Sequence, residues 1–293
     1  YILEWKMKIC IIGGGLTGLI SALNLARSHQ VDLFEQRPIT GGCLGSYQID
    51  DYWLEEYYHH CFTGDARLLA LIETLQIADR LEWLKGSTGY YVDGIIHPLT
   101  SPIEILRYPH LTFAEKVRLG LLTLRSRGLD ASALDEITAE DYILNTLGSG
   151  IYTSFFEPLL KSKFGDRRSE VSAAWLISRI AIRSDRGAGG ERLGYLRGGF
   201  QHLVARLQKE VERLSASVML DSQVKEIRRD TSGWFVDGES YDAIISTLPP
   251  QATAEIAGID IASIPYQGAA CMALALDRDV TDGIYWLNMK DTA

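Results

Sequence analysis

Residues 8–35 constrain the fold most, because in them a short apolar run leads directly into a cluster of glycines. Residues 9–12 have the composition of a strand that is buried on both faces. Gly13, Gly15 and Gly18 follow with the spacing G-x-G-x-x-G. In this pattern the first glycine makes a tight turn, the second allows close approach to a ligand, and the third packs a helix on the strand. The pattern therefore predicts a strand, a turn and a helix.

A second apolar segment, residues 31–34, ends in Glu35 about twenty residues after the glycines, where a carboxylate that binds ribose is expected. The start of the intervening helix offers unpaired N–H groups and a positive dipole end, which suit a diphosphate. Glu35 would repel a 2′-phosphate. We therefore expect a dinucleotide site for FAD or NAD rather than NADP, with a purely structural glycine turn as the alternative.

The composition is that of a globular protein with about two domains, because 46% of the 293 residues are hydrophobic. A net charge of −9 argues against nucleic acid as the main partner. Residues 9–26 carry no charge and are long enough to span a membrane. Three consecutive glycines within them favour a buried strand, turn and helix instead.

The cysteines indicate neither a disulfide framework nor a metal site, because they form no close pair and no ligand spacing. They are Cys10, Cys43, Cys61 and Cys271. Such thiols are typical of a reducing compartment, and residues 1–6 are too short and too charged for a signal peptide. His59 and His60 precede Cys61, but adjacent residues on a strand point to opposite faces. We expect a cytoplasmic protein without a bound metal.

A second glycine-rich loop, residues 36–46, follows Glu35 and contains the pair Gly41-Gly42. A strand, helix and strand, then an acid, then such a loop resemble the large FAD-containing family of amine oxidases, protoporphyrinogen oxidases and phytoene desaturases. In that family the loop wraps the flavin diphosphate and often has Arg after the glycine pair. This chain has Cys43 there, so the resemblance leaves Arg37 as the substitute for the phosphate charge.

Residues 55–62 are dense in groups that could line a flavin ring. They also resemble the Gly-Pro-His segment of UDP-galactopyranose mutases, with His60-Cys61-Phe62 in place of His-x-Phe and with Tyr58 and His59 in place of Gly-Pro. Two interpretations stay open. Either Tyr58 and His60 contact the flavin, or the segment is an aromatic strand in the core.

Local signals predict several further elements. Residues 47–49 and 52–62 are expected to pair as strands, and Thr63 to cap a helix over residues 65–75. Asp93-Gly94 predicts a hairpin turn. From residue 101 to about 184 the chain is expected to be mainly helical. The helix starts are marked by Ser101-Pro102, by Thr112 with Glu115, and by Thr138 with Asp141.

Basic residues stand out in and after this helical block. They are Lys161, Lys163, Arg167, Arg168, Arg179, Arg183, Arg186, Arg192 and Arg197. If several face inward they would favour an anionic substrate. The alternative is a solvated face, with Asp166, Glu170, Asp185 and Glu191 as partners.

The last third of the chain predicts a helix from Gly198-Gly199-Phe200, a strand over residues 217–227, a hairpin at 233–238 and a strand over 242–250. These segments resemble those in which the chain of the family's members re-enters the FAD domain. There, the resemblance implies that the backbone at Val224 contacts the adenine. Residues 266–276 and 283–289 are expected to be strands of a substrate-domain sheet. Family members continue into a further flavin-holding segment, so we expect the C-terminal part to be missing.

The sequence thus predicts an α/β fold with a Rossmann-like FAD-binding domain (1–89 and 190–260). A mainly helical cap and the start of a substrate sheet would form the second domain (90–189 and 261–293). The resemblance implies an FAD-dependent oxidoreductase that takes hydride from a small molecule, with a mutase-like flavoenzyme or a non-catalytic binding protein as alternatives. Related oxidases that act on greasy substrates often sit at a membrane surface, so membrane association stays open. No catalytic residue is predicted. The candidate cofactor-binding residues are Gly13, Gly15, Leu16, Thr17, Gly18, Glu35, Gln36, Arg37, Gly42, Cys43, Leu44, Tyr58, His59, His60, Val224 and Thr247.

Overall fold

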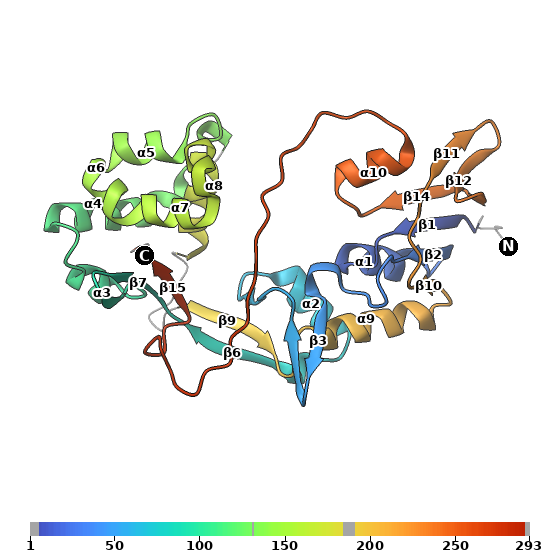
Figure 1. The fold of residues 1–293 in the computed structure, drawn as a ribbon, viewed down its shortest axis with the longest axis horizontal. Coiled ribbons are helices and arrows are strands. Elements are labelled where there is room, and N and C mark those ends of the chain that lie inside the picture. Colours follow the sequence, from blue (N-terminus) through green and yellow to red (C-terminus); the bar gives the residue numbers. More distant parts are fainter. Residues whose placement is uncertain (1–5, 131, 184–190, 291–293) are drawn as a thin grey trace. The chain divides into compact units, whose positions relative to one another are not determined.

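The computed structural model describes residues 6–130, 132–183 and 191–290 (Figure 1). It divides into two compact units. Unit 1 comprises residues 1–83 and 194–272, and unit 2 comprises residues 84–193 and 273–293. Strands β6 (Leu81–Gly86) and β9 (Glu191–Leu196) carry the chain from one unit to the other. We had expected the divisions at residues 89, 190 and 260.

Unit 1 is built on a four-stranded parallel sheet with the order β10-β2-β1-β14. The strands are β1 (Lys8–Ile12), β2 (Gln30–Phe34), β10 (Ser217–Met219) and β14 (Ala243–Ser246). Helix α1 (Leu16–Leu25) connects β1 to β2. The prediction of a mixed α/β fold with a parallel sheet is confirmed.

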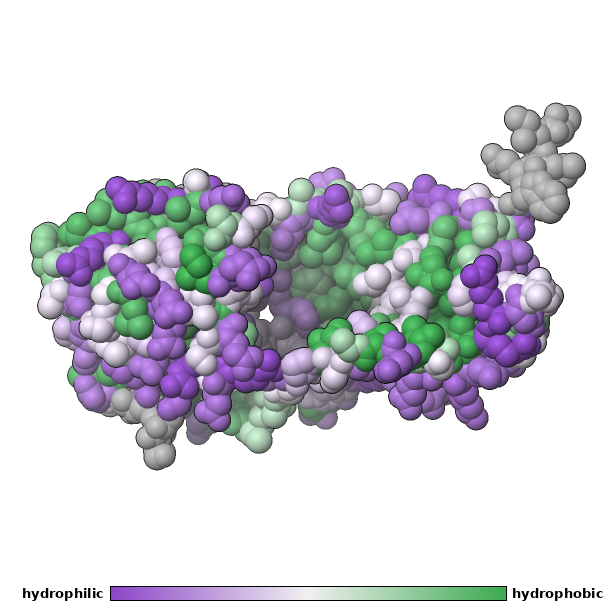
Figure 2. Space-filling model, turned by 90° about the horizontal axis from the view of Figure 1, so that it is seen from above, coloured by the Kyte–Doolittle hydropathy of each residue, from purple (hydrophilic) through white to green (hydrophobic). Residues whose placement is uncertain are grey.

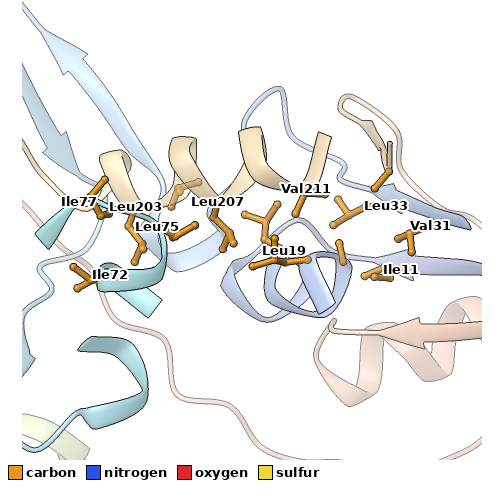
Figure 3. Close-up of a cluster of buried hydrophobic side chains, with 14 of the residues drawn as sticks. Ile11, Leu19, Val31, Leu33, Ile72, Leu75, Ile77, Leu203, Leu207 and Val211 are labelled. Atoms are coloured by element: carbon orange, nitrogen blue, oxygen red, sulfur yellow. The ribbon is translucent and has the colours of Figure 1, made fainter. Parts of the chain in front are cut away.

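Helices α1 and α9 (Gln201–Arg213) supply the apolar side chains that pack on this sheet. Figure 3 shows Leu207 and Val211 of α9 turned toward Leu19 of α1, beside Ile11 of β1. Each of these four side chains is fully buried. The predicted helix after Gly198-Gly199-Phe200 is therefore confirmed, because the spacing of its apolar residues matches one buried face.

Three short antiparallel strands pack with a second core cluster of unit 1. They are β11 (Ile227–Asp230), β12 (Gly233–Val236) and β13 (Glu239–Tyr241). The predicted hairpin turn at Asp237-Gly238 is present, with both residues at positive φ. The expected strand over 217–227 is wrong in its length. It stops at Met219 because Asp221 adopts a φ of +50° and the chain turns there. Helix α10 (Pro250–Ala257) follows β14.

The strand predicted over residues 52–62 is also shorter than expected. Strand β3 (Ser46–Ile49) pairs with β4 (Tyr52–Glu55), and β5 covers only Cys61–Phe62. Ser46 pairs with Glu55, and before Ser46 the partner strand becomes the second glycine-rich loop. The N–H of Glu56 still donates to the carbonyl oxygen of Gly45 at 2.9 Å, and beyond Glu56 the strand ends.

Helix α2 (Ala66–Thr74) begins after Asp65, not after Thr63 as predicted. The Asp65 carboxylate accepts a hydrogen bond from the N–H of Phe62 at 2.8 Å, which fixes the turn that leads into the helix. Thr63 was predicted because threonine suits a helix start, and no residue spacing indicates the hydrogen bond of Asp65.

Unit 2 contains a small sheet and a helical block. In the sheet, β7 (Thr88–Val92) pairs with β8 (Ile95–Pro98) and with β15 (Trp286–Met289). The turn at Asp93-Gly94 is confirmed, because both residues have positive φ. No strand forms over residues 266–276, where one was predicted. Met272 and Leu274 are 81% and 71% exposed there, since the described residues offer this segment no ladder partner.

The prediction of a mainly helical block is confirmed for the described residues. The helices are α3 (Pro102–Arg107), α4 (Phe113–Arg125), α5 (Ala139–Thr146), α6 (Ser149–Ile151), α7 (Glu157–Phe164) and α8 (Ala173–Arg183). Ser101 and Thr112 form capping boxes with Glu104 and Glu115, as their spacing indicates. No helix in the described parts of the chain is long and apolar enough to cross a membrane.

Candidate functional site

The carboxyl ends of three adjacent parallel strands bring predicted residues to one edge of the sheet in unit 1. Gly13 follows β1, Glu35 follows β2 and Thr247 follows β14. In open parallel sheets, ligands bind outside the carboxyl ends, where successive connections leave to opposite sides. Strand β1 marks such a point, because β2 lies on one side of it and β14 on the other.

The turn after β1 has no room for side chains. Gly13 has a φ of +105°, and a Cβ there would lie 2.5 Å from Oγ1 of Thr247. A Cβ on Gly18 would lie 1.9 Å from the carbonyl oxygen of Gly13, so α1 packs directly on the turn. The Thr247 hydroxyl donates to the carbonyl oxygens of Ile12 and Gly13, at 3.0 and 3.2 Å. Backbone atoms and glycines therefore form this turn.

The second glycine-rich loop packs on the first turn through its backbone. The N–H of Gly41 donates to the carbonyl oxygen of Gly14 at 2.9 Å. A Cβ on Gly42 would lie 3.0 Å from the Cα of Gly15. Only glycine allows two backbones to approach so closely. The two loops thus form one cradle with polar backbone groups.

Helix α1 begins at this cradle, and its N-cap residue Gly15 makes no side-chain capping bond. The N–H groups of the first turn, including those of Leu16, Thr17 and Gly18, have no acceptors within the helix. They lie at the positive end of the helix dipole. This donor set suits the oxygens of a diphosphate.

Glu35 is 7% exposed, and its carboxylate faces the first turn. Oε2 accepts from the N–H of Gly14 at 2.8 Å, and Oε1 accepts from the N–H of Arg37 at 2.9 Å. An ionised carboxylate has about four acceptor positions, so it retains capacity for ribose hydroxyls. Its charge also opposes a phosphate at the same place.

Arg37 already has a carboxylate partner. Its guanidinium donates to both oxygens of Glu56, with 3.1 Å between Nη1 and Oε2. The hydrogen bond to Glu56 raises the pKa of Arg37 further above its ordinary value. The role of Arg37 as the counter-charge that Cys43 lacks stays a prediction, and it requires Arg37 to leave Glu56 for a phosphate. Gln36 and Cys43 are exposed, and Leu44 packs against the main core of unit 1.

Val224 lies in a segment that hydrogen-bonds to the Glu35 region. The N–H of Ser222 donates to the carbonyl oxygen of Glu35 at 2.9 Å, and the N–H of Asp221 donates to that of Arg37 at 3.1 Å. The side chain of Val224 is 5% exposed and belongs to the core cluster of Ile12. Its predicted contact with adenine is a backbone contact, so burial of the side chain leaves that contact open.

Tyr58, His59 and His60 belong to a different segment, the irregular residues 56–60. His59 bonds the carbonyl oxygen of Tyr57 through Nδ1 at 2.8 Å, and the His60 ring lies edge-on to Phe62 at 5.0 Å. Tyr58 is 57% exposed. The alternative of an aromatic core strand is therefore wrong for these residues. Their contact with a flavin ring stays a prediction.

Sequence reasoning missed Glu55, which joins three elements of unit 1. Its carboxylate accepts from the N–H of Phe200 at 2.8 Å and from the hydroxyl of Tyr195. It thus links β4 to β9 and to the start of α9. No spacing signals this contact, because the partners are about 140 positions away. The only hint is the pair Glu55-Glu56 within an aromatic stretch.

Several described basic residues of the predicted cluster have side-chain partners. Arg167 pairs with Glu170, and Arg168 lies 3.6 Å from Glu157. Lys163 and Arg179 lie over the ring of Trp175. These contacts favour the solvated interpretation, and the anionic substrate stays a prediction. Outside the described residues lie Asp185, Arg186 and the side chains of Arg183 and Glu191.

The thiols take no part in a cluster with other potential ligands. Cys10 and Cys61 are buried, Cys43 and Cys271 are exposed, and all four are free. Burial, with a contribution from the charge of Asp32, raises the pKa of the Cys10 thiol to about 12. Across the described ranges, no group of three or more His, Cys, Asp or Glu side chains could hold a metal ion.

A cavity of about 790 Å³ lies away from the glycine cradle, at the C-terminal ends of α1 and α2. Arg27, Arg206 and Arg213 line it together with leucines. Arg206 donates through Nε to the carbonyl oxygen of Leu75 at 3.0 Å, and Arg213 pairs with Glu210. The Arg206 contact is that of an arginine that stabilises a helix C-terminus, whereas the Arg213 contact is an ion pair within α9.

Comparison with known proteins identifies relatives of the chain. The sequence model of the family described as flavin containing amine oxidoreductase matches residues 16–286. The 15-cis-phytoene desaturase of Synechococcus elongatus is 25% identical over 240 residues, which are 75% of this chain and 50% of that protein. The coproporphyrinogen III oxidase of Mycobacterium tuberculosis is 24% identical over 283 residues, 84% of this chain and 60% of that protein.

A crystal structure of an oxidoreductase from Methanosarcina mazei superposes with a TM-score of 0.66. The superposition covers 86% of this chain and 61% of that chain, at 19% sequence identity, and so shows a shared fold. The chain therefore spans between half and about 60% of the length of these proteins.

Proposed function

The chain belongs to the flavin containing amine oxidoreductase family, and from this premise we propose that it is an FAD-dependent oxidoreductase acting on a small molecule. FAD, when bound, would supply the acceptor for a hydride from a substrate C–H next to nitrogen or an unsaturated system. Unit 1 would be a Rossmann-like FAD-binding domain. The helical block of unit 2 would be the cap that contributes substrate contacts.

One observation carries this proposal: two glycine-rich loops meet backbone to backbone beside a buried carboxylate. The cradle would hold the diphosphate through N–H groups of the first turn and of Gly42 and Cys43, whereas the N–H of Leu44 already donates to the carbonyl oxygen of Gly41. Glu35 would accept from ribose hydroxyls. The backbone at Val224 would contact the adenine, and Thr247 would keep the first turn closed.

The relatives suggest the substrate class. One is named for a desaturase of phytoene and another for an oxidase of coproporphyrinogen III. Both names describe the oxidation of unsaturated organic molecules. We propose the same class for this chain, and assign orientation of the substrate, rather than proton transfer, to the protein.

A titration with FAD tests the proposal. The chain should bind FAD and then show visible flavin absorption bands. Glu35→Ala should weaken FAD binding by about tenfold or more, because it removes charge-assisted hydrogen bonds. Glu82→Ala is the matched control, since it removes an exposed acid of unit 1 that pairs with Arg197. Folded chain without FAD affinity, or equal binding by Glu35→Ala, would refute the proposal.

Product analysis separates the two alternatives from an oxidase. A mutase-like flavoenzyme, suggested by His60-Cys61-Phe62, would isomerise a nucleotide sugar without net oxidation. A non-catalytic binding protein would retain the flavin absorption bands unchanged when candidate substrates are added without oxygen. An oxidoreductase would lose those bands and form an oxidised product in equal amount.

A further inference from the structure

The cavity of about 790 Å³ at the C-terminal ends of α1 and α2 takes no part in the flavin site proposed above. Its volume lies within the range of about 300–1,000 Å³ that is typical of small-molecule sites. The glycine cradle lies at the other end of α1, a 10-residue helix that is about 15 Å long. The cavity and the cradle are therefore separate places in unit 1.

Two helices bring three arginines to this cavity. Arg27 follows the end of α1, whereas Arg206 and Arg213 lie on α9. Arg206, Glu210 and Arg213 are four and three positions apart, so they share one side of α9. Helices α1 and α9 pack on each other through the main core of unit 1, which fixes the places of the three arginines along the backbone.

Glu210 and a backbone carbonyl group hold two of the guanidinium groups in position. Oε1 of Glu210 lies 3.1 Å from Nη2 of Arg206, and Oε2 accepts from Nε of Arg213 at 2.8 Å. Arg206 also donates through Nε to the carbonyl oxygen of Leu75 at 3.0 Å. Both arginines are thus ordered in the wall of the cavity before any ligand arrives.

Most of the N–H donors on these arginines remain available to a ligand. A guanidinium group carries five N–H donors in a planar fork. Within the described residues, the side chain of Arg27 makes no hydrogen bond or ion pair, and that of Arg213 bonds through Nε alone. Such forks bind the oxygens of phosphate and carboxylate groups in pairs. The cavity therefore offers a surplus of donors to an anion.

The cavity also has a positive charge, although the whole chain has a net charge of −9. Three arginines line it together with one carboxylate, that of Glu210. The C-terminal ends of α1 and α2 add at most about half a negative charge each, so a net positive charge of about one remains. A positive site on an acidic protein attracts anions locally.

Leucines give the cavity an apolar wall beside the arginines. Leu23 and Leu75 belong to the main core of unit 1, where Figure 3 labels Leu75, and Leu214 packs against that core. Figure 2 shows hydrophobic and hydrophilic residues side by side over much of one face of the molecule, so an apolar side chain at the surface does not by itself mark a site. Here the leucines line the same hollow as three arginines, which suits a ligand with an anionic group and an apolar body.

We propose that this cavity binds a small organic phosphate, with its phosphate group on Arg27, Arg206 and Arg213 and its apolar part against the leucines. A phosphate monoester carries a charge of about −1.5 to −2 at pH 7 and three strong acceptor oxygens. A carboxylate has one charge and two oxygens and would leave more of the donors unused. The proposal concerns unit 1 alone and does not depend on flavin binding.

Isothermal titration calorimetry of the whole 293-residue chain with phenyl phosphate tests this proposal. Phenyl phosphate should bind, and its affinity should fall by about tenfold when the salt is raised from about 0.1 M to about 1 M. Inorganic phosphate should bind about threefold or more weakly, because it lacks the apolar ring. Phenol should bind about tenfold or more weakly, because it lacks the charge.

Arginine variants locate the binding site. Arg27→Gln with Arg213→Gln should weaken phenyl phosphate binding by about tenfold or more, because the change removes charge-assisted hydrogen bonds. Arg27→Gln alone breaks no side-chain contact with the described residues and should weaken binding by about threefold. Arg229→Gln is the matched control, because Arg229 is an exposed arginine of β11 outside the cavity, and it should bind as the wild type does. Circular dichroism should stay unchanged in all three.

Three results would overturn the proposal. The first is a folded chain that does not bind phenyl phosphate. The second is undiminished binding by the double arginine variant, or an equal loss for Arg229→Gln, either of which would place the anion elsewhere. The third is inorganic phosphate that binds as tightly as phenyl phosphate, which would assign the cavity to an inorganic anion.

Discussion

The two units differ in what holds their key features together. In unit 1 the cradle of the candidate site is built mainly from backbone atoms, and a carbonyl oxygen or a backbone carbon lies where a side chain would begin, as at Gly18 and Gly42. In unit 2, helices α3, α4 and α5 begin with side-chain caps such as Ser101 and Thr112, and the core of the unit is a cluster of apolar side chains. A turn built from closely packed backbone tolerates almost no added atoms. A core built from side chains can adjust its side-chain conformations around a substitution.

The largest expected effect comes from placing the same methyl group in both units. Gly18→Ala puts a Cβ 1.9 Å from a carbonyl oxygen, so it should lower the free energy of unfolding by about 2–4 kcal/mol and abolish FAD binding. Gly120→Ala in α4 meets nothing within 4 Å and should raise that free energy by about 0.5–1 kcal/mol. Urea denaturation measures both. Equal effects on the two variants would break the comparison.

Glu55 tests the same comparison within unit 1, because it is a side chain that holds β4, β9 and the start of α9 together. Glu55→Ala removes the acceptor of the Phe200 N–H and of the Tyr195 hydroxyl. The free energy of unfolding should fall by about 2 kcal/mol, as measured by urea denaturation. Glu55→Gln should restore part of it, since the amide oxygen still accepts one bond. No rescue by glutamine would mean that packing, not hydrogen bonding, explains the loss.

A capping residue gives the corresponding test in unit 2. Thr112→Ala removes the side-chain oxygen that accepts the N–H of Glu115 and should lower the free energy of unfolding by about 1 kcal/mol. Thr112→Ser keeps this oxygen and should be close to wild type. Thermal unfolding followed by circular dichroism measures the difference. A loss as large as that from Gly18→Ala would contradict the greater tolerance expected of unit 2.

The smallest expected effects are on the pH dependence of stability. His97 in unit 2 and His202 in unit 1 provide the test, because the pKa of each is lowered in the folded chain. Burial and His110 lower the pKa of His97 in unit 2, and burial and Arg80 lower that of His202 in unit 1. Because the unfolded chain then binds protons more readily, stability should decrease as the pH falls below about 6.5. It should level off once the folded-state pKa is passed. His97→Gln and His202→Gln should each make urea denaturation less pH-dependent over this range, and an unchanged slope would contradict the shift.

Local chemistry explains what the sequence predicted well. Asp93-Gly94 makes a turn because both residues accept positive φ, and Ser101-Pro102 starts a helix because its bonds close within one turn. The glycine spacing after β1 likewise predicts its own turn. In each case the residues that make the structure are neighbours in the chain.

Distant contacts explain the rest. Strand formation needs a ladder partner, so the mainly apolar residues 266–276 do not specify a strand by themselves. Glu55 finds its partners far along the chain. The start of α2 is a local exception, because Asp65 rather than Thr63 precedes the helix and accepts a hydrogen bond from the N–H of Phe62, three residues before it. For the candidate site, spacing predicted Gly13 and Glu35 at one edge of the sheet. It offered no sign that Glu56 would hold Arg37.

The close approach of Gly15 and Gly42 has a consequence for how such a chain can change over generations. A side chain at Gly42 would meet the Cα of Gly15 at 3.0 Å, so the second loop cannot gain a side chain there while the first loop stays as it is. We therefore expect two segments that are separated by more than twenty positions to evolve together. Mutational routes out of this arrangement must alter both loops together or lose it.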